Sequence, residues 1–307
     1  MTANYMIITG GDETYATLIE ELVQSIRDKP QGKEVEIGVL DGGLSAEAVH
    51  RFESDYRCHM ITPPWEYELP KRRVRGREYL RVELAKAFLD RYFPDPEVLL
   101  WIDADAWVQD WHAIDWLTKS AQLGNLAIVS QVSRLSDQVV RVRWNWLRQP
   151  VVKGILYKNA KRAGLPRLIQ RQLAARPTLN AGVYALRQDA PHWEHWRTHQ
   201  ARVLPKGRIF TASQLAIGLM TYVDRLPHTP LPVTCNYMGP WRFDEQRRHF
   251  VEYHFPYRKC GIIHMAGEDE MRRNPDHRVE VPDLEGRMHS LSLRYAHWRQ
   301  VEKKTDA

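Results

Sequence analysis

The chain has 307 residues, of which 43% are hydrophobic and 27% are charged, and its formal net charge is +6 at pH 7. This composition excludes a disordered chain and allows one substantial core or two modest ones. No apolar stretch approaches the length that spans a bilayer, and no basic-then-apolar leader opens the sequence. The cysteines are few and widely spaced, so they predict neither a zinc site nor a disulfide framework: Cys58, Cys235 and Cys260. A cytoplasmic location is therefore expected, and the basic excess favours anionic ligands or surfaces.

Segments typical of strands and helices alternate from the start, which predicts an α/β fold. In the first expected helix, Leu18, Leu22 and Ile26 recur at intervals of four and form one apolar stripe. The expected elements are, in chain order, a strand over 5–9, a helix over about 15–27, a strand over 35–40, a short helix over 46–52, a strand ending at 61, a long helix over about 77–91, a strand over 98–102, a helix from about 112, strands over 126–129 and 181–186, helices over about 193–203 and 211–220, and a strand over 261–265.

A single domain is expected over residues 1–283, followed by a charged tail over 284–307. A basic segment, expected to be a helical insertion over about 131–178, interrupts the domain. Its cations stand against one acid, Asp137, and Trp144, Trp146 and Tyr157 are interleaved with them. The cations are Arg134, Arg141, Arg143, Arg148, Lys153, Lys158, Lys161, Arg162, Arg167, Arg171 and Arg176.

The strand over 98–102 ends in two carboxylates, Asp103 and Asp105, separated by one alanine. A short apolar run of this kind is typical of a buried strand, and ligands bind beyond the carboxyl ends of such strands. Residues two apart in an extended chain point the same way, so both carboxylates can address one cation. Oxygen ligands with room for water suit Mg²⁺ or Mn²⁺ that carries a phosphate-containing substrate. The alternative is that an acidic residue caps the next helix, a role that Asp110 could fill ahead of His112.

Several motifs occur in the order found in one known family. Together they resemble the retaining glycosyltransferases of family 8, which have the GT-A fold, a mixed but mostly parallel sheet covered by helices, and transfer sugars from nucleotide diphosphates. The motifs are Gly11-Asp12-Glu13-Thr14-Tyr15, Val39-Leu40-Asp41-Gly42-Gly43-Leu44-Ser45, Tyr79-Leu80-Arg81, Asp103-Ala104-Asp105, Asn180-Ala181-Gly182-Val183 and His264-Met265-Ala266-Gly267.

The resemblance implies a metal site made of Asp103, Asp105 and His264, and this mixed set of oxygen and nitrogen ligands suits Mn²⁺, with Mg²⁺ as the alternative. A histidine at the end of a strand is more often an ordinary, partly buried residue. The resemblance also implies that Asp12 and Tyr15 hold the uracil of a UDP-sugar by hydrogen bonding and stacking. Without a ligand, Asp12 would cap the following helix and Tyr15 would pack against it.

The same resemblance assigns further residues to the donor. Arg81 would contact the donor through its guanidinium fork, although an exposed helical arginine is the ordinary alternative. Asn180, Ala181 and Gly182 would bind the donor sugar, with a turn before a strand as the alternative. Gln214 would lie near the anomeric carbon, unless it makes a structural hydrogen bond. Ala104 and Gly267 belong to the matching motifs and are assigned to the donor with them.

Two positions depart from the family pattern. Ser213 stands where the family commonly has Asp, and Glu270 stands where it has Lys. A carboxylate would repel a diphosphate, so Glu270 is expected to point away. Arg272 or Arg273 is then the candidate for the missing positive charge.

The expected function is metal-dependent, retaining transfer of a hexose from a UDP-sugar to a glycan or lipid-linked acceptor. The sequence places no second carboxylate as a nucleophile, so the acceptor is expected to attack the face that the leaving group vacates, with Gln214 steadying the oxocarbenium-like state. One alternative is a sugar-nucleotide-binding protein without transferase activity. Another is a sugar nucleotidyltransferase, but its loop after the first strand would be basic, whereas Gly10-Gly11-Asp12-Glu13 is acidic.

The basic segment has three interpretations. It is a solvated surface, a contact with an acceptor or anionic membrane, or a nucleic-acid site in which Trp144 and Trp146 stack on bases. No nucleic-acid-binding motif accompanies the charge, so no nucleic-acid partner is expected. A lid on the acceptor side of the site, or peripheral contact with the inner face of a membrane, is the expectation retained.

Overall fold

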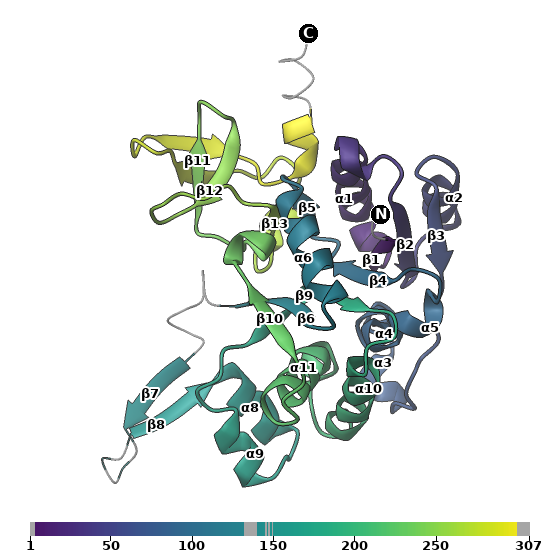
Figure 1. Cartoon of the computed structure of the whole chain (residues 1–307), viewed down its shortest axis with the longest axis vertical. Coiled ribbons are helices and arrows are strands. Elements are labelled where there is room, and N and C mark those ends of the chain that lie inside the picture. The colour runs from purple at the N-terminus through teal and green to yellow at the C-terminus, as the bar shows by residue number, and fades with distance from the viewer. Residues whose placement is uncertain (1–3, 132–139, 145, 147, 149, 300–307) are drawn as a thin grey trace.

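The computed structural model describes residues 4–131, 140–144, 146, 148 and 150–299. A seven-stranded sheet with the order β10-β6-β9-β4-β1-β2-β3 forms its centre (Figure 1). All neighbouring strands are parallel except β9, which is antiparallel to both β4 and β6. The strands are β1 (Tyr5–Gly11), β2 (Glu36–Asp41), β3 (Cys58–Ile61), β4 (Val98–Ile102), β6 (Leu126–Ser130), β9 (Leu179–Arg187) and β10 (His228–Leu231). The predicted α/β fold with a mixed, mostly parallel sheet is confirmed.

Helices cover both faces of this sheet because its strands are apolar on both sides. In β4, Val98, Leu100 and Ile102 join the core on one face, and Leu99 and Trp101 join the core on the other. The first face packs against α1 (Ala16–Arg27), α2 (Ala46–Ser54) and α6 (His112–Gln122). The second packs against α4 (Leu80–Ala85), η3 (Lys86–Phe88), α5 (Leu89–Tyr92), α10 (His192–Val203) and α11 (Ala212–Tyr222) (Figure 1).

The long helix expected over 77–91 is not continuous, since α4, η3 and α5 follow one another as three short helices. This correction matters because Lys86 begins the 3-10 turn and its side chain is buried. The remaining short helices are η1 (Glu13–Tyr15), η2 (Pro30–Gly32), α3 (Lys71–Val74), η4 (Ile209–Thr211) and η5 (Val233–Asn236).

A second lobe follows the sheet and brings distant residues back to it. Strand β13 (Ile262–His264) is antiparallel to β5 (Ala106–Val108), with His264 opposite Ala106. This pairing places His264 directly beside the Asp-x-Asp motif. The rest of the lobe consists of β11 (Trp241–Asp244), β12 (His249–Glu252), α12 (Asp269–Arg273), β14 (Val279–Pro282) and β15 (Met288–Leu291).

The basic segment is only partly helical, which corrects the prediction of a helical insertion. Its described part begins with a hairpin of β7 (Val140–Trp144) and β8 (Pro150–Gly154) and continues with α8 (Ile155–Arg162) and α9 (Arg167–Gln172). Valine alternating with arginine over 140–143 is typical of a strand, and this periodicity outweighs the helical tendency of the cations. Arg134 and Asp137 lie outside the described residues.

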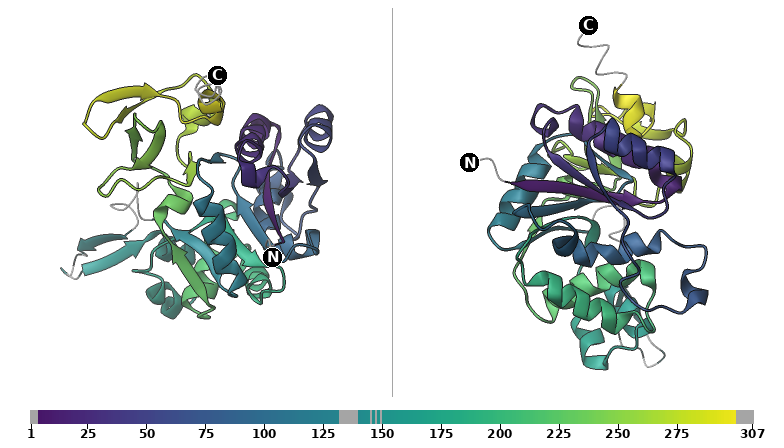
Figure 2. Two further views of the ribbon diagram at one scale, coloured as in Figure 1. Left: turned by 45° about the horizontal axis from the view of Figure 1, so that its top comes forward. Right: turned by 90° about the vertical axis from the view of Figure 1, so that its right-hand side faces the viewer.

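The segment expected to be a charged tail from residue 284 is folded as far as Arg299. The β14–β15 hairpin crosses the predicted boundary, and Leu293, Tyr295 and Trp298 belong to the core that contains α1. Figure 2 shows this yellow segment beside the purple α1. Charged residues surround these three buried apolar side chains in the sequence. The composition of the segment therefore did not indicate that it is folded. Within the described ranges, no helix is long and apolar enough to cross a lipid bilayer.

Candidate functional site

A cleft of about 610 Å³ lies at the edge of the sheet where β1 and β4 end. Because β9 runs antiparallel to β4, its first residues reach the same edge, and the Asp103 amide donates to the Gly182 carbonyl at 2.7 Å. The structure brings most of the sequence-predicted residues together here. Those that line the cleft are Asp12, Tyr15, Asp103, Ala104, Asp105, Asn180, Ala181, Gly182, Gln214, His264 and Gly267.

Arg81 is the predicted site residue that does not line this cleft. It belongs to α4, where its neighbour Val82 and the next residue, Glu83, do line the cleft. Consecutive helical residues point in different directions, so a motif match does not fix the direction of one side chain. The expectation that Arg81 contacts the donor therefore has no support from its position.

Asp103, Asp105 and His264 each offer one ligand atom, and these atoms all lie within 4.8 Å of one another. Asp105 and His264 are 6% and 3% exposed, and His264 Nε2 lies 3.2 Å from Asp105 Oδ1. The strand pairing of β5 with β13 causes this convergence. Two carboxylates and an imidazole make a donor set that suits a divalent cation such as Mn²⁺.

Asn236 determines which nitrogen of His264 is available. The Asn236 Oδ1 atom lies 2.7 Å from His264 Nδ1, and the Asn236 Nδ2 group donates to Asn180 Oδ1 at 3.1 Å. Because the amide oxygen can only accept, Nδ1 carries the proton and Nε2 faces the carboxylates. Burial alone would lower the pKa of His264, but the charges of Asp105 and Asp103 raise it above its ordinary value.

Asn236→Ala is expected to weaken Mn²⁺ binding by about 10–100-fold, since the partner that orients the imidazole is lost. Calorimetric titration with Mn²⁺ in the presence of UDP measures this change. Asn274→Ala is the matched control, because the Asn274 side chain accepts a hydrogen bond from the Asp276 amide in an exposed turn. An unchanged Mn²⁺ affinity in Asn236→Ala would contradict the orienting role.

Asp103 is held by two donors from the protein interior. Its Oδ1 atom accepts from Lys86 Nζ at 2.8 Å and from Trp101 Nε1 at 2.7 Å. Lys86 is buried and also pairs with Glu83 at 2.8 Å. Burial would lower the pKa of Lys86, but the carboxylates of Asp103 and Glu83 raise it instead. Sequence reasoning missed Lys86 and Glu83, although a lysine within the apolar run over 84–89 is a usable signal, since a buried cation needs partners.

Asp105 contacts the guanidinium of Arg272, with Nη1 at 2.9 Å from Oδ2. Burial opposes ionisation of Asp105, but His264 and Arg272 outweigh it and lower the pKa to about 2. Arg272 also lies 3.3 Å from the Tyr15 hydroxyl, so it bridges two sides of the cleft. Glu270 is exposed and does not line the cleft, which agrees with the expectation that it points away.

Gly182 leaves no room for a side chain. A Cβ atom at this position would lie 2.5 Å from Asp103 Oδ2, 2.6 Å from His264 Cε1 and 2.7 Å from Asn180 Oδ1. The Asn180 Oδ1 atom accepts from the Gly182 amide at 2.7 Å, which fixes the backbone close to the metal-binding candidates. Glycine is therefore required here by close approach.

Gly182→Ala is expected to destabilise the fold by about 1–3 kcal/mol and to weaken Mn²⁺ binding, since the methyl group must displace the candidate ligands. Gly38→Ala is the matched control, because Gly38 lies in β2 of the same sheet but outside the cleft, and its Cβ would lie 2.6 Å from the Phe93 ring. Chemical denaturation and Mn²⁺ titration of both variants test this. Equal Mn²⁺ affinities in the two variants would contradict the assignment.

Asp12 both caps a helix and lines the cleft. Its Oδ1 atom accepts from the Thr14 amide at 3.1 Å at the start of η1, as the structural alternative predicted. Tyr15 lines the same end of the cleft, and burial raises the pKa of its hydroxyl. Gly10 and Gly11 line the cleft beside these side chains.

Ser213, which stands where the resembling family commonly has Asp, lies beside the carboxyl group of another residue. Ser213 is fully buried, and its hydroxyl donates to the Glu83 carbonyl at 3.0 Å. The Glu83 carboxyl group also hydrogen-bonds to Ser213, and burial raises the pKa of Glu83. A carboxylate from α4 therefore lies beside the position where the family has Asp.

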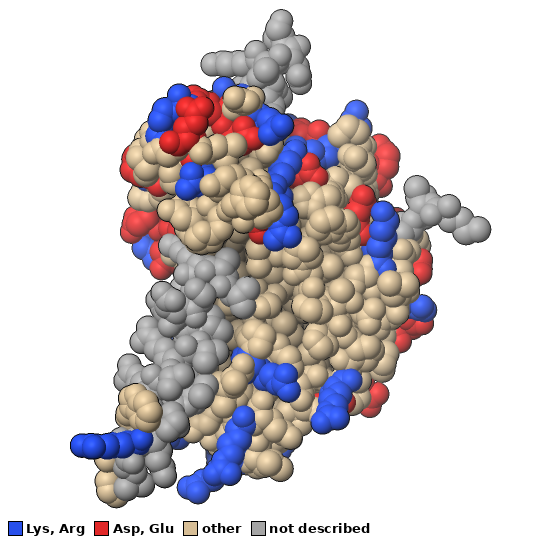
Figure 3. Space-filling model, turned by 60° about the vertical axis from the view of Figure 1, so that its left-hand side comes forward, with Lys and Arg blue, Asp and Glu red and all other residues tan. Residues whose placement is uncertain are grey.

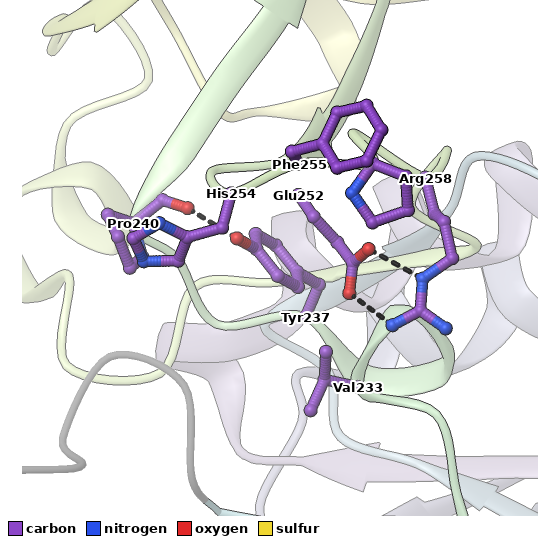
Figure 4. A pocket seen from close by; sticks show the side chains of 8 residues that line it. Val233, Tyr237, Pro240, Glu252, His254, Phe255 and Arg258 are labelled. Carbon is purple, nitrogen blue, oxygen red and sulfur yellow. Dashed lines mark hydrogen bonds and ion pairs between the residues drawn. The ribbon is translucent and has the colours of Figure 1, made fainter.

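A smaller cavity of about 220 Å³ lies in the second lobe (Figure 4). Glu252 and Arg258 form a two-point ion pair in its wall, and the Tyr237 hydroxyl donates to the Pro240 carbonyl at 2.7 Å. The Tyr237 backbone accepts from the His264 amide at 2.9 Å. This lobe thus supports the strand that carries His264.

No protein-family model matches the chain, and no curated protein sequence matches it. Solved structures do. The apo structure of the bifunctional glycosyltransferase WbbM matches with a TM-score of 0.51 and 15% identity over 87% of this chain and 46% of that one. Apo mouse xyloside xylosyltransferase 1 matches with a TM-score of 0.50 and 10% identity over 87% and 98%. The galactosyltransferase LgtC with donor and acceptor sugar analogues gives 0.48 and 16% over 85% and 87%. The chain thus has a fold found in glycosyltransferases, and the predicted GT-A fold is confirmed.

Proposed function

We propose that this chain is a metal-dependent retaining glycosyltransferase of the family 8 type, which transfers a hexose from a UDP-sugar to a glycan or lipid-linked acceptor. The observation that carries the proposal is the convergence of Asp103, Asp105 and His264 inside a cleft. The cleft has a glycine-bordered end at Asp12 and Tyr15 for a base, and an amide-bearing end at Asn180 and Gln214 for a sugar.

The donor set fits a divalent cation. Two carboxylates and the Nε2 atom of His264 would hold Mn²⁺, with Mg²⁺ as the alternative. Bound there, the metal would neutralise charge on the departing diphosphate. Arg272 lies 2.9 Å from Asp105 and adds a fixed positive charge at the same place. Family 8 has a lysine at the position of Glu270. In this chain, Arg272 would supply the positive charge of that lysine.

The remaining cleft residues position the sugar. Asn180 offers an amide to sugar hydroxyls, and the backbone of Ala181 and Gly182 allows close approach. Glu83 is a carboxylate of the cleft that the sequence did not single out, but its ion pair with Lys86 makes it a positioning group rather than a free nucleophile. The acceptor then attacks the face that the leaving group vacates, and Gln214 steadies the oxocarbenium-like state.

A donor-hydrolysis screen tests this function. UDP-, GDP- and CMP-sugars are incubated with the full chain in Mn²⁺ and in chelator, and free sugar and nucleotide are measured. The proposal expects hydrolysis of a UDP-sugar that requires Mn²⁺. A chain that binds the nucleotide but neither hydrolyses the donor nor glycosylates an added acceptor would favour a binding protein. Release of pyrophosphate from UTP and a sugar 1-phosphate would favour a nucleotidyltransferase.

A further inference from the structure

One long stretch of the sequence carries cations without acids. From residue 138 to residue 188 the sequence contains no Asp or Glu. Helices α8 and α9 and the turns that flank them belong to this stretch, and their cations are exposed to solvent. The exposed cations are Lys158, Lys161, Arg162, Arg167, Arg171 and Arg176. Figure 3 shows Lys and Arg with few acidic side chains near them over the lower part of this face, whereas the upper lobe carries both signs.

These helices are anchored, so their cations face outward. Leu156 and Ala160 of α8, together with Leu165 and Leu173, are buried in a cluster with side chains of α4 and α11. An amphipathic helix that lies in a membrane must offer its apolar face to lipid, and α8 has already buried that face in the protein. The remaining surface suits electrostatic contact with a large anionic partner.

The hairpin that precedes α8 adds two exposed aromatic side chains. Trp144 is 71% exposed and Trp146 is 89% exposed. The hairpin leads directly into α8 and lies beside it (Figure 1). Tryptophan is enriched where lipid headgroups meet the hydrocarbon, because its ring is apolar and its N–H group needs a polar partner.

This basic end, defined as the β7–β8 hairpin with α8 and α9, contacts through α8 the helix α11, which carries the cleft residue Gln214. Phe210 lines the cleft and is 64% exposed, and Gln131, which directly follows β6, also lines it. Lys206 and Arg208, just before Phe210, are exposed as well. The basic end and the cleft are therefore connected through α11.

We propose that the basic end docks on an anionic phospholipid bilayer, with Trp144 and Trp146 at headgroup level. Charge complementarity favours this occupant, since the acid-free stretch matches a surface of uniform negative charge. The exposed indoles suit the headgroup region. As a consequence that rests on the proposed function, the acceptor is lipid-linked and reaches the cleft from the bilayer surface.

Vesicle flotation of the full chain without any donor tests the docking. Binding is expected to vesicles of phosphatidylcholine with phosphatidylglycerol, and not to vesicles of phosphatidylcholine alone. The triple variant K158Q/K161Q/R162Q is expected to bind at least about tenfold more weakly. The control K33Q/R57Q/K119Q removes the same charge from exposed positions outside the basic end and is expected to bind like the unaltered chain. The variant W144S/W146S is expected to lose the binding that persists at high salt.

The outcomes separate docking from catalysis. Hydrolysis of a soluble donor is expected to be equal in the triple variant and in its control, so an inactive enzyme that still binds anionic vesicles would contradict only the proposed function. Equal binding to neutral and anionic vesicles, or equal loss in the control variant, would overturn the docking proposal. A single-stranded oligonucleotide that binds where vesicles do not, with loss in the triple variant, would assign the basic end to nucleic acid instead.

Discussion

Asp103→Asn is expected to reduce Mn²⁺-dependent hydrolysis of the donor roughly a thousandfold, because stabilisation of the leaving group by a bound cation contributes several kcal/mol. The substitution keeps the shape of the side chain, and its amide oxygen can still accept from Lys86 and Trp101, as Asp103 Oδ1 does. Lys86 also retains its partner Glu83. The fold is therefore expected to survive while the negative charge facing the cleft is lost.

Initial rates at saturating donor, with and without Mn²⁺, measure this effect. Asp115→Asn is the matched control, because Asp115 is a half-exposed residue of α6 whose partner Lys119 lies 4.0 Å away. Its activity is expected to equal that of the unaltered chain. Undiminished Mn²⁺-dependent hydrolysis in Asp103→Asn would be incompatible with the proposed metal site.

Arg294→Met is expected to destabilise the protein by about 3–5 kcal/mol, since it leaves Glu21 buried without its partner. Arg294 is 2% exposed, and its Nε group lies 3.0 Å from both oxygens of Glu21 in α1. It also donates to the backbone carbonyls of Met271 and Arg272 at 3.3 Å. The pair therefore ties the C-terminal segment to the sheet domain and supports the helix that presents Arg272 to the cleft.

Urea unfolding measures the free energy of this change. The double variant Glu21→Leu/Arg294→Met is expected to recover most of the loss, because no unpaired charge remains buried. Arg299→Met is the matched control: its partner Asp28 is partly exposed, so the expected loss is below about 1 kcal/mol. If Arg294→Met and Arg299→Met had equal unfolding free energies, the C-terminal segment would not be integrated as described.

The sequence was sufficient for the sheet and for the acidic pair because both depend on local patterns. The alternation of apolar runs with helical stripes predicts the layers, and the position of Asp103 at the end of an apolar run predicts the edge where it lies. His264 required more, since only its pairing through β13 with β5 brings it to that edge. The order of the family-like motifs predicted His264 as the third candidate metal ligand, which the pattern of apolar residues could not do.

Other features depend on contacts between distant segments. Lys86 and Asn236 act through Asp103 and His264, which lie 17 and 28 residues away in the chain. The apolar run around Lys86 signals that it needs a partner, but it does not identify which residue that partner is. Arg81 belongs to a matching motif, but it does not line the cleft. The C-terminal segment was misjudged because its charged residues are spread among its apolar ones without a clear helical or strand period, although Leu293 and Tyr295 are fully buried.

Titration of the protein with Mn²⁺ in the presence of UDP, followed by the electron paramagnetic resonance signal of the free ion, tests the metal site most directly. One tightly bound ion per chain is expected, and this binding is expected to be lost in Asp103→Asn/Asp105→Asn/His264→Ala while circular dichroism shows that the fold is retained. Equal binding by the triple variant and the unaltered chain, or no tight binding by either, would contradict the proposed metal site.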